Sequence, residues 1–127
     1  MLPRWDPNIF CGIPFLASIQ NAVLYPLTYL TIIFPTAIGI NLSIFFNMLL
    51  AAIFMYFLAF ELTDNYYSAI CAAIVYSLAG FSATVIFYGH LTIINSIPYL
   101  AGGFYALLKL QKTLKFKYSF FLAIAWF

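Results

Sequence analysis

Apolar residues run along this chain in long stretches that charged residues rarely interrupt. No Asp, Glu, Lys or Arg occurs from Pro7 to Phe60, or again from Asn65 to Leu108. A helix that crosses a bilayer needs about 20 apolar residues, so either stretch is longer than one span requires. This pattern predicts an all-α integral membrane protein whose helices form a bundle.

Helix-breaking and charged residues divide the apolar stretches into separate helices. Pro35 suits a helix start, Glu61–Asp64 forms a polar connection, and Gly89–His90 is typical of a turn. We therefore expect three full spans and a truncated fourth, over about residues 36–60, 66–88, 94–110 and 118–127. Because the chain stops inside the last apolar run, we expect it to be a fragment of a longer protein.

The first 35 residues are predicted to form an irregular or interfacial external loop with short helices. Proline removes a backbone donor and, together with Gly12, excludes a regular helix at the start. Residues 14–34 are long enough to cross a membrane, but Gln20, Asn21 and Pro26 favour an interfacial or re-entrant helix. If this segment spans instead, the N-terminus lies on the opposite side of the membrane.

Lysines set the expected orientation, because loops rich in Lys and Arg remain cytoplasmic. All four lysines follow the third predicted span, at positions 109, 112, 115 and 117. The Glu61–Asp64 connection is then also cytoplasmic. The Gly89–His90 turn and the N-terminal loop are expected on the extracytoplasmic face.

Small and amide side chains inside the spans are expected to serve helix packing. Small residues let helices approach closely in lipid, and amides are costly there unless they face the bundle interior. The small residues are Ala69, Ala73, Ser77, Gly80 and Thr84 in the second span and Gly102 and Gly103 in the third. The amides are Asn41 and Asn47 in the first span, where hydrogen bonding between helices is favoured over a substrate role.

Composition excludes several classes of function. Only 6% of the residues are charged, against about 25% in a typical soluble domain. The chain has no P-loop, GxSxG, HExxH or paired-cysteine motif, so a nucleotide-binding site, a soluble hydrolase and a cysteine-ligated metal site are not expected, whereas a divalent cation as cofactor stays open. Cys11 and Cys71 are expected to be structural, Cys71 as a buried small apolar residue. The lysines indicate topology and no nucleic-acid partner.

Five residues outside the spans are candidates for substrate binding. Arg4 has the guanidinium geometry that binds phosphate, whereas Trp5 and Tyr25 have rings that stack on a sugar or lipid head group. Asp6 is suited to act as a base or to bind a divalent cation, or else to close a turn before Pro7, which its position favours. His90 is suited to a proton shuttle, a phosphate contact or a ligand, with a solvated turn residue as the alternative.

The first loop resembles that of YfhO-type bacterial membrane proteins, a branch of the GT-C-fold glycosyltransferases. The shared features are Pro3-Arg4-Trp5-Asp6-Pro7, Gly12-Ile13-Pro14-Phe15 and Tyr25-Pro26, followed by Ser77-Leu78-Ala79-Gly80-Phe81, Gly89-His90 and Pro98. The order of these features across nearly the whole chain carries the resemblance. The family usually has Asn in place of Asp6 and often His in place of Asn47.

The resemblance implies a glycosyltransferase-like protein of the bacterial plasma membrane that takes a polyprenyl-phosphate-linked sugar to a cell-envelope acceptor at the extracytoplasmic face. The acidic base of such enzymes follows their first span, which would precede Met1, so Asp6 is not assigned that role. The catalytic residues of this fragment are therefore unknown, and it is expected to be inactive alone. The alternatives are a transporter or flippase-like carrier lined by Gln20, Asn41 and Asn47, and a noncatalytic membrane subunit.

Overall fold

The computed structural model describes Trp5, Gly12, Pro14, residues 25–113 and Tyr118, and the fold within 25–113 is helical, without strands. Three helical segments are long and apolar enough to cross a membrane: Thr36–Thr63, Tyr66–Phe87 and Leu91–Thr113. The predicted all-α class with three apolar helices is confirmed. In the part predicted as a truncated fourth span, only Tyr118 is described, and it is helical.

The chain divides into two compact units, and the first comprises residues 1–43. Its described elements are the 3-10 helix η3 (Pro26–Tyr29), the single turn α1 (Leu30–Ile33) and the start of α2. Extended backbone at Phe34 separates α1 from α2. The choice between an interfacial and a spanning segment depends on residues 15–24, which lie outside the described residues.

Gly39 lets the start of α2 lie directly against the backbone of α1. A Cβ atom at Gly39 would lie 2.6 Å from the Cα of Thr31 and 2.7 Å from the carbonyl oxygen of Leu30. Real Cβ atoms do not approach backbone this closely, so a larger residue would require the turn to move. The sequence therefore folds tightly where the short helices meet α2.

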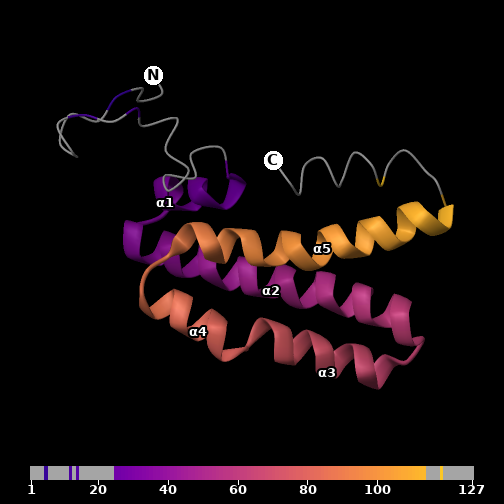
Figure 1. Cartoon of the computed structure of the whole chain (residues 1–127). Coiled ribbons are helices and arrows are strands. Elements are labelled where there is room, and N and C mark those ends of the chain that lie inside the picture. Colours follow the sequence, from indigo (N-terminus) through magenta and orange to yellow (C-terminus); the bar gives the residue numbers. More distant parts are fainter. Residues whose placement is uncertain (1–4, 6–11, 13, 15–24, 114–117, 119–127) are drawn as a thin grey trace. The chain divides into compact units, whose positions relative to one another are not determined.

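The second unit, residues 44–127, contains the rest of α2 (Thr36–Thr63), α3 (Tyr66–Ser77), α4 (Gly80–Phe87) and α5 (Leu91–Thr113). Figure 1 shows α5 running alongside α2, with α3 and α4 following one another on the return path. The predicted order of the three apolar helical segments is therefore observed. The ends differ: α2 and α5 extend past residues 60 and 110, so that Glu61 and Lys112 are helical rather than in loops.

Local chemistry explains the narrow turn between α2 and α3. Asp64 has a φ of 49°, a left-handed conformation that ends a helix, and its amide donates to the carbonyl of Phe60. Asn65 then caps α3, because its side-chain oxygen accepts hydrogen bonds from the amides of Tyr67 and Ser68. Two residues thus replace the longer connection that the sequence predicts.

The second predicted span is not one continuous helix. Ala79 has extended backbone angles (φ −56°, ψ 148°), which separate α3 from α4. The break also changes which residues are buried. On α3, Ala69, Ala73 and Ser77 are buried as expected. On α4 the buried residues are Ser82 and Val85. Gly80 and Thr84 are exposed, so the predicted continuation of the small-residue stripe is wrong beyond the break.

Helices α2 and α5 run parallel and pair in a constant register. Four contacts join the two helices, and each joins residues that are 48 positions apart in the sequence. The pairs are Asn47–Asn95, Phe54–Gly102, Phe57–Tyr105 and Glu61–Lys109. Along each helix, successive contact residues are seven, three and four positions apart. A repeated spacing of seven, with steps of three and four between, keeps one stripe of a helix facing its neighbour. We call these four pairs the α2–α5 seam.

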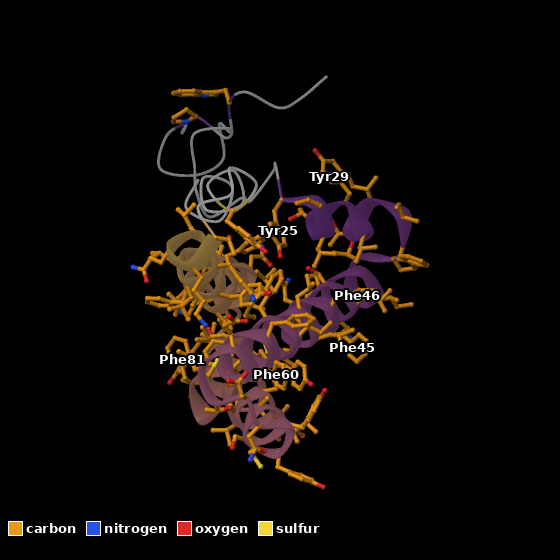
Figure 2. All side chains as sticks on the ribbon, turned by 90° about the vertical axis from the view of Figure 1, so that its right-hand side faces the viewer. Tyr25, Tyr29, Phe45, Phe46, Phe60 and Phe81 are labelled. Atoms are coloured by element: carbon orange, nitrogen blue, oxygen red, sulfur yellow. The ribbon has the colours of Figure 1, made fainter. Side chains whose placement is uncertain are left out.

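Glycine allows close approach in the middle of the seam. A Cβ atom at Gly102 would lie 3.0 Å from the Phe54 ring, and Gly102 and Gly103 are both buried. This confirms the packing role predicted for the two glycines. Large apolar side chains are instead exposed on the outer faces, as Figure 2 shows for Phe45 and Phe46. An apolar exterior of this kind is typical of helices that face lipid.

Two expectations about single residues are wrong. Asn41 is exposed on α2, whereas Asn47 is fully buried, so only Asn47 faces the interior. Cys71 is exposed on α3 rather than buried as a small apolar side chain. Both differences have the same reason: the position of a residue around its helix decides whether it faces a neighbouring helix or the outside. Asn41 and Cys71 lie on the outer faces of α2 and α3. Cys11 lies outside the described residues.

Candidate functional site

The predicted site residues fall in both units. Arg4 and Asp6 lie outside the described residues, Trp5 and Tyr25 belong to the first unit, and His90 belongs to the second. Tyr25 precedes η3 with extended backbone, and its carbonyl accepts a hydrogen bond from the amide of Thr28. Each candidate is therefore described by its own surroundings.

Trp5 is held by a local contact with glycine. A Cβ atom at Gly12 would lie 2.5 Å from the indole carbon Cζ2 of Trp5, so the ring occupies space that only glycine leaves open. Gly12 also has a φ of 114°, which side-chain-bearing residues rarely adopt. Trp5 nevertheless remains 59% exposed as a whole residue. Gly12 thus lies against one edge of the Trp5 ring, while most of the Trp5 residue remains exposed.

His90 lies at a capped turn between α4 and α5. The amide of His90 donates to the carbonyl of Val85, and the amide of Gly89 donates to that of Ile86. With Gly89 at a φ of 71°, these bonds form the Schellman ending of a helix. The carbonyl of His90 in turn accepts from the amides of Ile93 and Ile94 at the start of α5.

The turn therefore presents His90 from a fixed backbone. Its side chain is exposed, and its ring centroid lies 6.4 Å from that of Tyr88, which is 67% exposed. Among the residues that the structure describes, no group of three or more His, Cys, Asp and Glu is placed to bind a metal ion. The arrangement suits contact with a polar or aromatic ligand at one end of the unit.

A polar layer crosses the interior of the second unit. The side-chain amide of Asn47 on α2 donates to Asn95 Oδ1 on α5 over 2.9 Å, and Asn47 is fully buried. The hydroxyl of Tyr76 on α3 donates to the carbonyl of Ile97 over 2.9 Å, next to Pro98. This confirms the interhelical role expected for Asn47. Sequence reasoning missed Asn95, although an amide inside a long charge-free stretch is the same signal.

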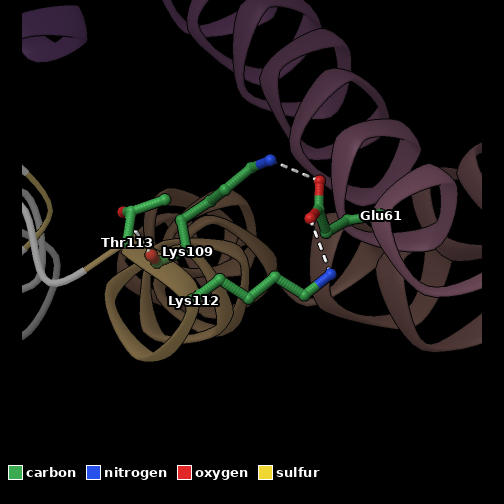
Figure 3. A network of polar contacts seen from close by, with 4 residues as sticks. All are labelled: Glu61, Lys109, Lys112 and Thr113. Carbon is green, nitrogen blue, oxygen red and sulfur yellow. Dashed lines mark hydrogen bonds and ion pairs between the residues drawn. The ribbon is translucent and has the colours of Figure 1, made fainter.

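An ionic cluster occupies the opposite end of the unit from His90. Glu61 on α2 binds Lys109 Nζ at 2.5 Å and Lys112 Nζ at 2.9 Å, one through each carboxylate oxygen (Figure 3). Lys109 Nζ also lies 5.8 Å from the centroid of the Tyr105 ring. We call Glu61, Lys109 and Lys112 the lysine cluster. The sequence predicts these charges at the ends of the apolar helices but does not show that Glu61 pairs with both lysines.

Helix geometry gives the separation of the two ends. Leu91, next to His90, and Lys109 are joined by α5, whose rise of about 1.5 Å per residue separates them by about 27 Å. The hydrocarbon core of a bilayer is about 30 Å thick. By the same rise, Asn47 lies about 21 Å along α2 from Glu61, so the polar layer is nearer the His90 end.

Comparison with protein-family models, curated proteins and solved structures finds no match for this chain.

Proposed function

We propose that this chain is the transmembrane part of a membrane protein, with the lysine cluster cytoplasmic and His90 extracytoplasmic. The observation that carries the proposal is the separation of two unlike ends by about one hydrocarbon thickness. Charged side chains gather at one end, whereas the other carries the exposed Tyr88 and His90. The apolar exteriors of α2 to α5 agree with lipid between these ends.

We further propose that the parent protein is a glycosyltransferase-like enzyme acting on a polyprenyl-phosphate-linked sugar. The resemblance to the YfhO-type proteins is the main support. The exposed Trp5 ring on Gly12 and the fixed, exposed His90 add to it, since aromatic faces stack on sugars and imidazole binds phosphate. Arg4, Asp6 and Tyr25 complete the proposed substrate-binding set, and the base is expected to lie outside this chain.

Photo-crosslinking tests this function. A polyprenyl phosphate carrying a diazirine near its phosphate is added to the protein in lipid nanodiscs, and adducts are mapped by peptide sequencing. We expect adducts in residues 1–26 or at Tyr88–His90, and competition by unlabelled polyprenyl-phosphate sugar. Trp5→Ala should reduce the yield, whereas Tyr67→Ala, which removes another exposed ring, should not. Adducts spread evenly along the lipid-facing helices would contradict the proposal.

A transporter or flippase-like carrier is the second candidate function. The observation that favours it is the break between α3 and α4, which lies inside an apolar segment. The break lies about 17 Å along α3 from Tyr66, and therefore at hydrocarbon depth if the helix spans. Broken helices in transporters line substrate paths near the membrane midplane. Pro98, which cannot donate a backbone hydrogen bond, lies inside α5 next to Ile97, whose carbonyl accepts from the hydroxyl of Tyr76.

Water access distinguishes the two candidates. In a background with Cys11 and Cys71 replaced by Ala, a cysteine at Gly80 is treated with a charged methanethiosulfonate reagent in sealed membranes. A carrier with a water-filled path predicts modification of Gly80→Cys, whereas a helix packed in lipid or protein predicts protection. Gly80 is suitable because a Cβ atom there meets no atom within 4 Å.

A further inference from the structure

The lysine cluster leaves hydrogen-bond donors directed away from its own carboxylate. An ammonium group carries three donors, and each lysine uses one on Glu61. The Glu61 side chain is 17% exposed and that of Lys109 is 24% exposed, whereas that of Lys112 is 57% exposed. The carboxylate is thus the least exposed member of the cluster and Lys112 the most exposed, and Figure 3 shows both lysine side chains reaching the carboxylate.

The charge around the cluster remains positive. Glu61 carries one negative charge against the two positive charges of Lys109 and Lys112, so the lysine cluster has a net charge of +1. By holding two ammonium groups on one carboxylate, Glu61 keeps both near the same point despite their mutual repulsion. The result is a local excess of positive charge with two donors already brought together.

Apolar surface adjoins the same charges. The Tyr105 ring lies beneath Lys109 Nζ and contacts the Phe57 ring, with centroids 5.9 Å apart. Phe57, one turn before Glu61 on α2, is 45% exposed. A ligand that carries an anionic group next to hydrocarbon chains matches this combination better than a free anion. Long lysine side chains at helix ends also place their charges at the level of lipid head groups.

We propose that Lys109 and Lys112, held together by Glu61, bind the phosphate of an anionic phospholipid. Basic groups at the ends of transmembrane helices bind anionic head groups, and each lysine near the surface contributes about 1 kcal/mol, or about fivefold in affinity. The acyl chains would lie along Phe57 and Tyr105. This inference rests on the proposed membrane insertion but not on the glycosyltransferase-like activity.

The test measures binding of fluorescent phosphatidylglycerol to the protein in nanodiscs of phosphatidylcholine. Lys112→Gln should weaken binding about fivefold, and Lys112→Arg, which keeps the charge, should restore it. Gln111→Ala is the matched control, because Gln111 is an exposed neighbour without charge. Unchanged binding in Lys112→Gln, or an equal loss in Gln111→Ala, would overturn the proposal.

A second pair of variants separates positioning from net charge. Glu61→Gln and Asp64→Asn each remove one negative charge, but only Glu61 contacts the lysines. Asn is well tolerated at the left-handed φ of residue 64. We expect Asp64→Asn to bind phosphatidylglycerol more tightly than Glu61→Gln does, because Glu61→Gln releases both lysines. The reverse order would mean that net charge alone attracts the lipid, and would overturn the positioning role.

Two further readouts identify the ligand and the origin of a failure. Inorganic phosphate at the same concentration should not displace the lipid, and displacement would indicate a site for a free anion instead. Incorporation of the protein into nanodiscs of phosphatidylcholine alone tests membrane insertion. Failure of incorporation would contradict the proposed function, whereas incorporation without preference for phosphatidylglycerol would contradict only the lipid site.

Discussion

Truncation of Asn47 tests whether the polar layer fixes the register of α2 and α5. Asn47 is fully buried and donates to Asn95 Oδ1 over 2.9 Å, at one end of the α2–α5 seam. Asn47→Ala removes this donor, so that the Asn95 side-chain oxygen loses its hydrogen bond to Asn47 within an apolar pair of helices. A single buried amide is known to fix the register of paired helices, because a shifted register would leave it facing apolar groups.

The expected loss follows from two contributions. A buried polar group that loses its partner costs about 1–3 kcal/mol, and the hydrogen bond itself contributes about 0.6–2 kcal/mol between helices in a membrane. We expect Asn47→Ala to destabilise by about 2 kcal/mol. In a double-mutant cycle with Asn95→Ala, the coupling energy should be about 1 kcal/mol, since the double variant has no amide left to satisfy.

Equilibrium unfolding of the reconstituted protein in mixed micelles with increasing SDS measures these energies. Asn41→Ala is the control, because Asn41 lies on the same helix but is exposed. It should change stability by less than about 0.5 kcal/mol. Two results would contradict the stabilising role of the polar layer at the α2–α5 seam. One is a loss of stability in Asn47→Ala no larger than that in Asn41→Ala, and the other is a double-mutant cycle without coupling energy between Asn47 and Asn95.

Two further predictions concern single contacts within each unit. Gly39→Ala should destabilise the protein by about 1–3 kcal/mol, because the added methyl group would meet the backbone of Thr31. Gly80→Ala is the control and should be neutral or stabilising, because its methyl group would enter open space. Equal unfolding midpoints of the two variants in SDS would contradict the close packing at Gly39. Tyr76→Phe should lower the free energy of unfolding by about 0.5–1.5 kcal/mol, because the hydrogen bond to the carbonyl of Ile97 is lost. The same SDS unfolding measures this, and an unchanged midpoint would show that the hydroxyl does not stabilise the fold.

The apolar pattern was sufficient to predict the helices but not all of their ends. Asp64 and Asn65 end α2 and begin α3 through a left-handed residue and a side-chain cap, so a two-residue connection was enough. The break before Gly80 was missed because composition on both sides of it is equally apolar. A single extended residue, Ala79, interrupts the helix without any polar signal in the sequence.

Pairing between distant residues could not be predicted from local spacing. The partners of Asn47 and Glu61 lie 48 or more positions away, and only the parallel register of α2 and α5 brings them together. The sequence did identify Asn47 as an interior residue and His90 as a turn residue, because the cost of an amide in lipid and the glycine before His90 are local properties.

Cysteine labelling from the two sides of the membrane tests the central proposal most directly. Single cysteines replace His90 and the exposed Gln111 in a background without Cys11 and Cys71, in sealed right-side-out vesicles. A membrane-impermeant maleimide should label His90→Cys in intact vesicles and Gln111→Cys only after permeabilisation. Labelling of both positions from the same side, or of Gln111→Cys alone from outside, would contradict a bundle that crosses the membrane with its lysines in the cytoplasm.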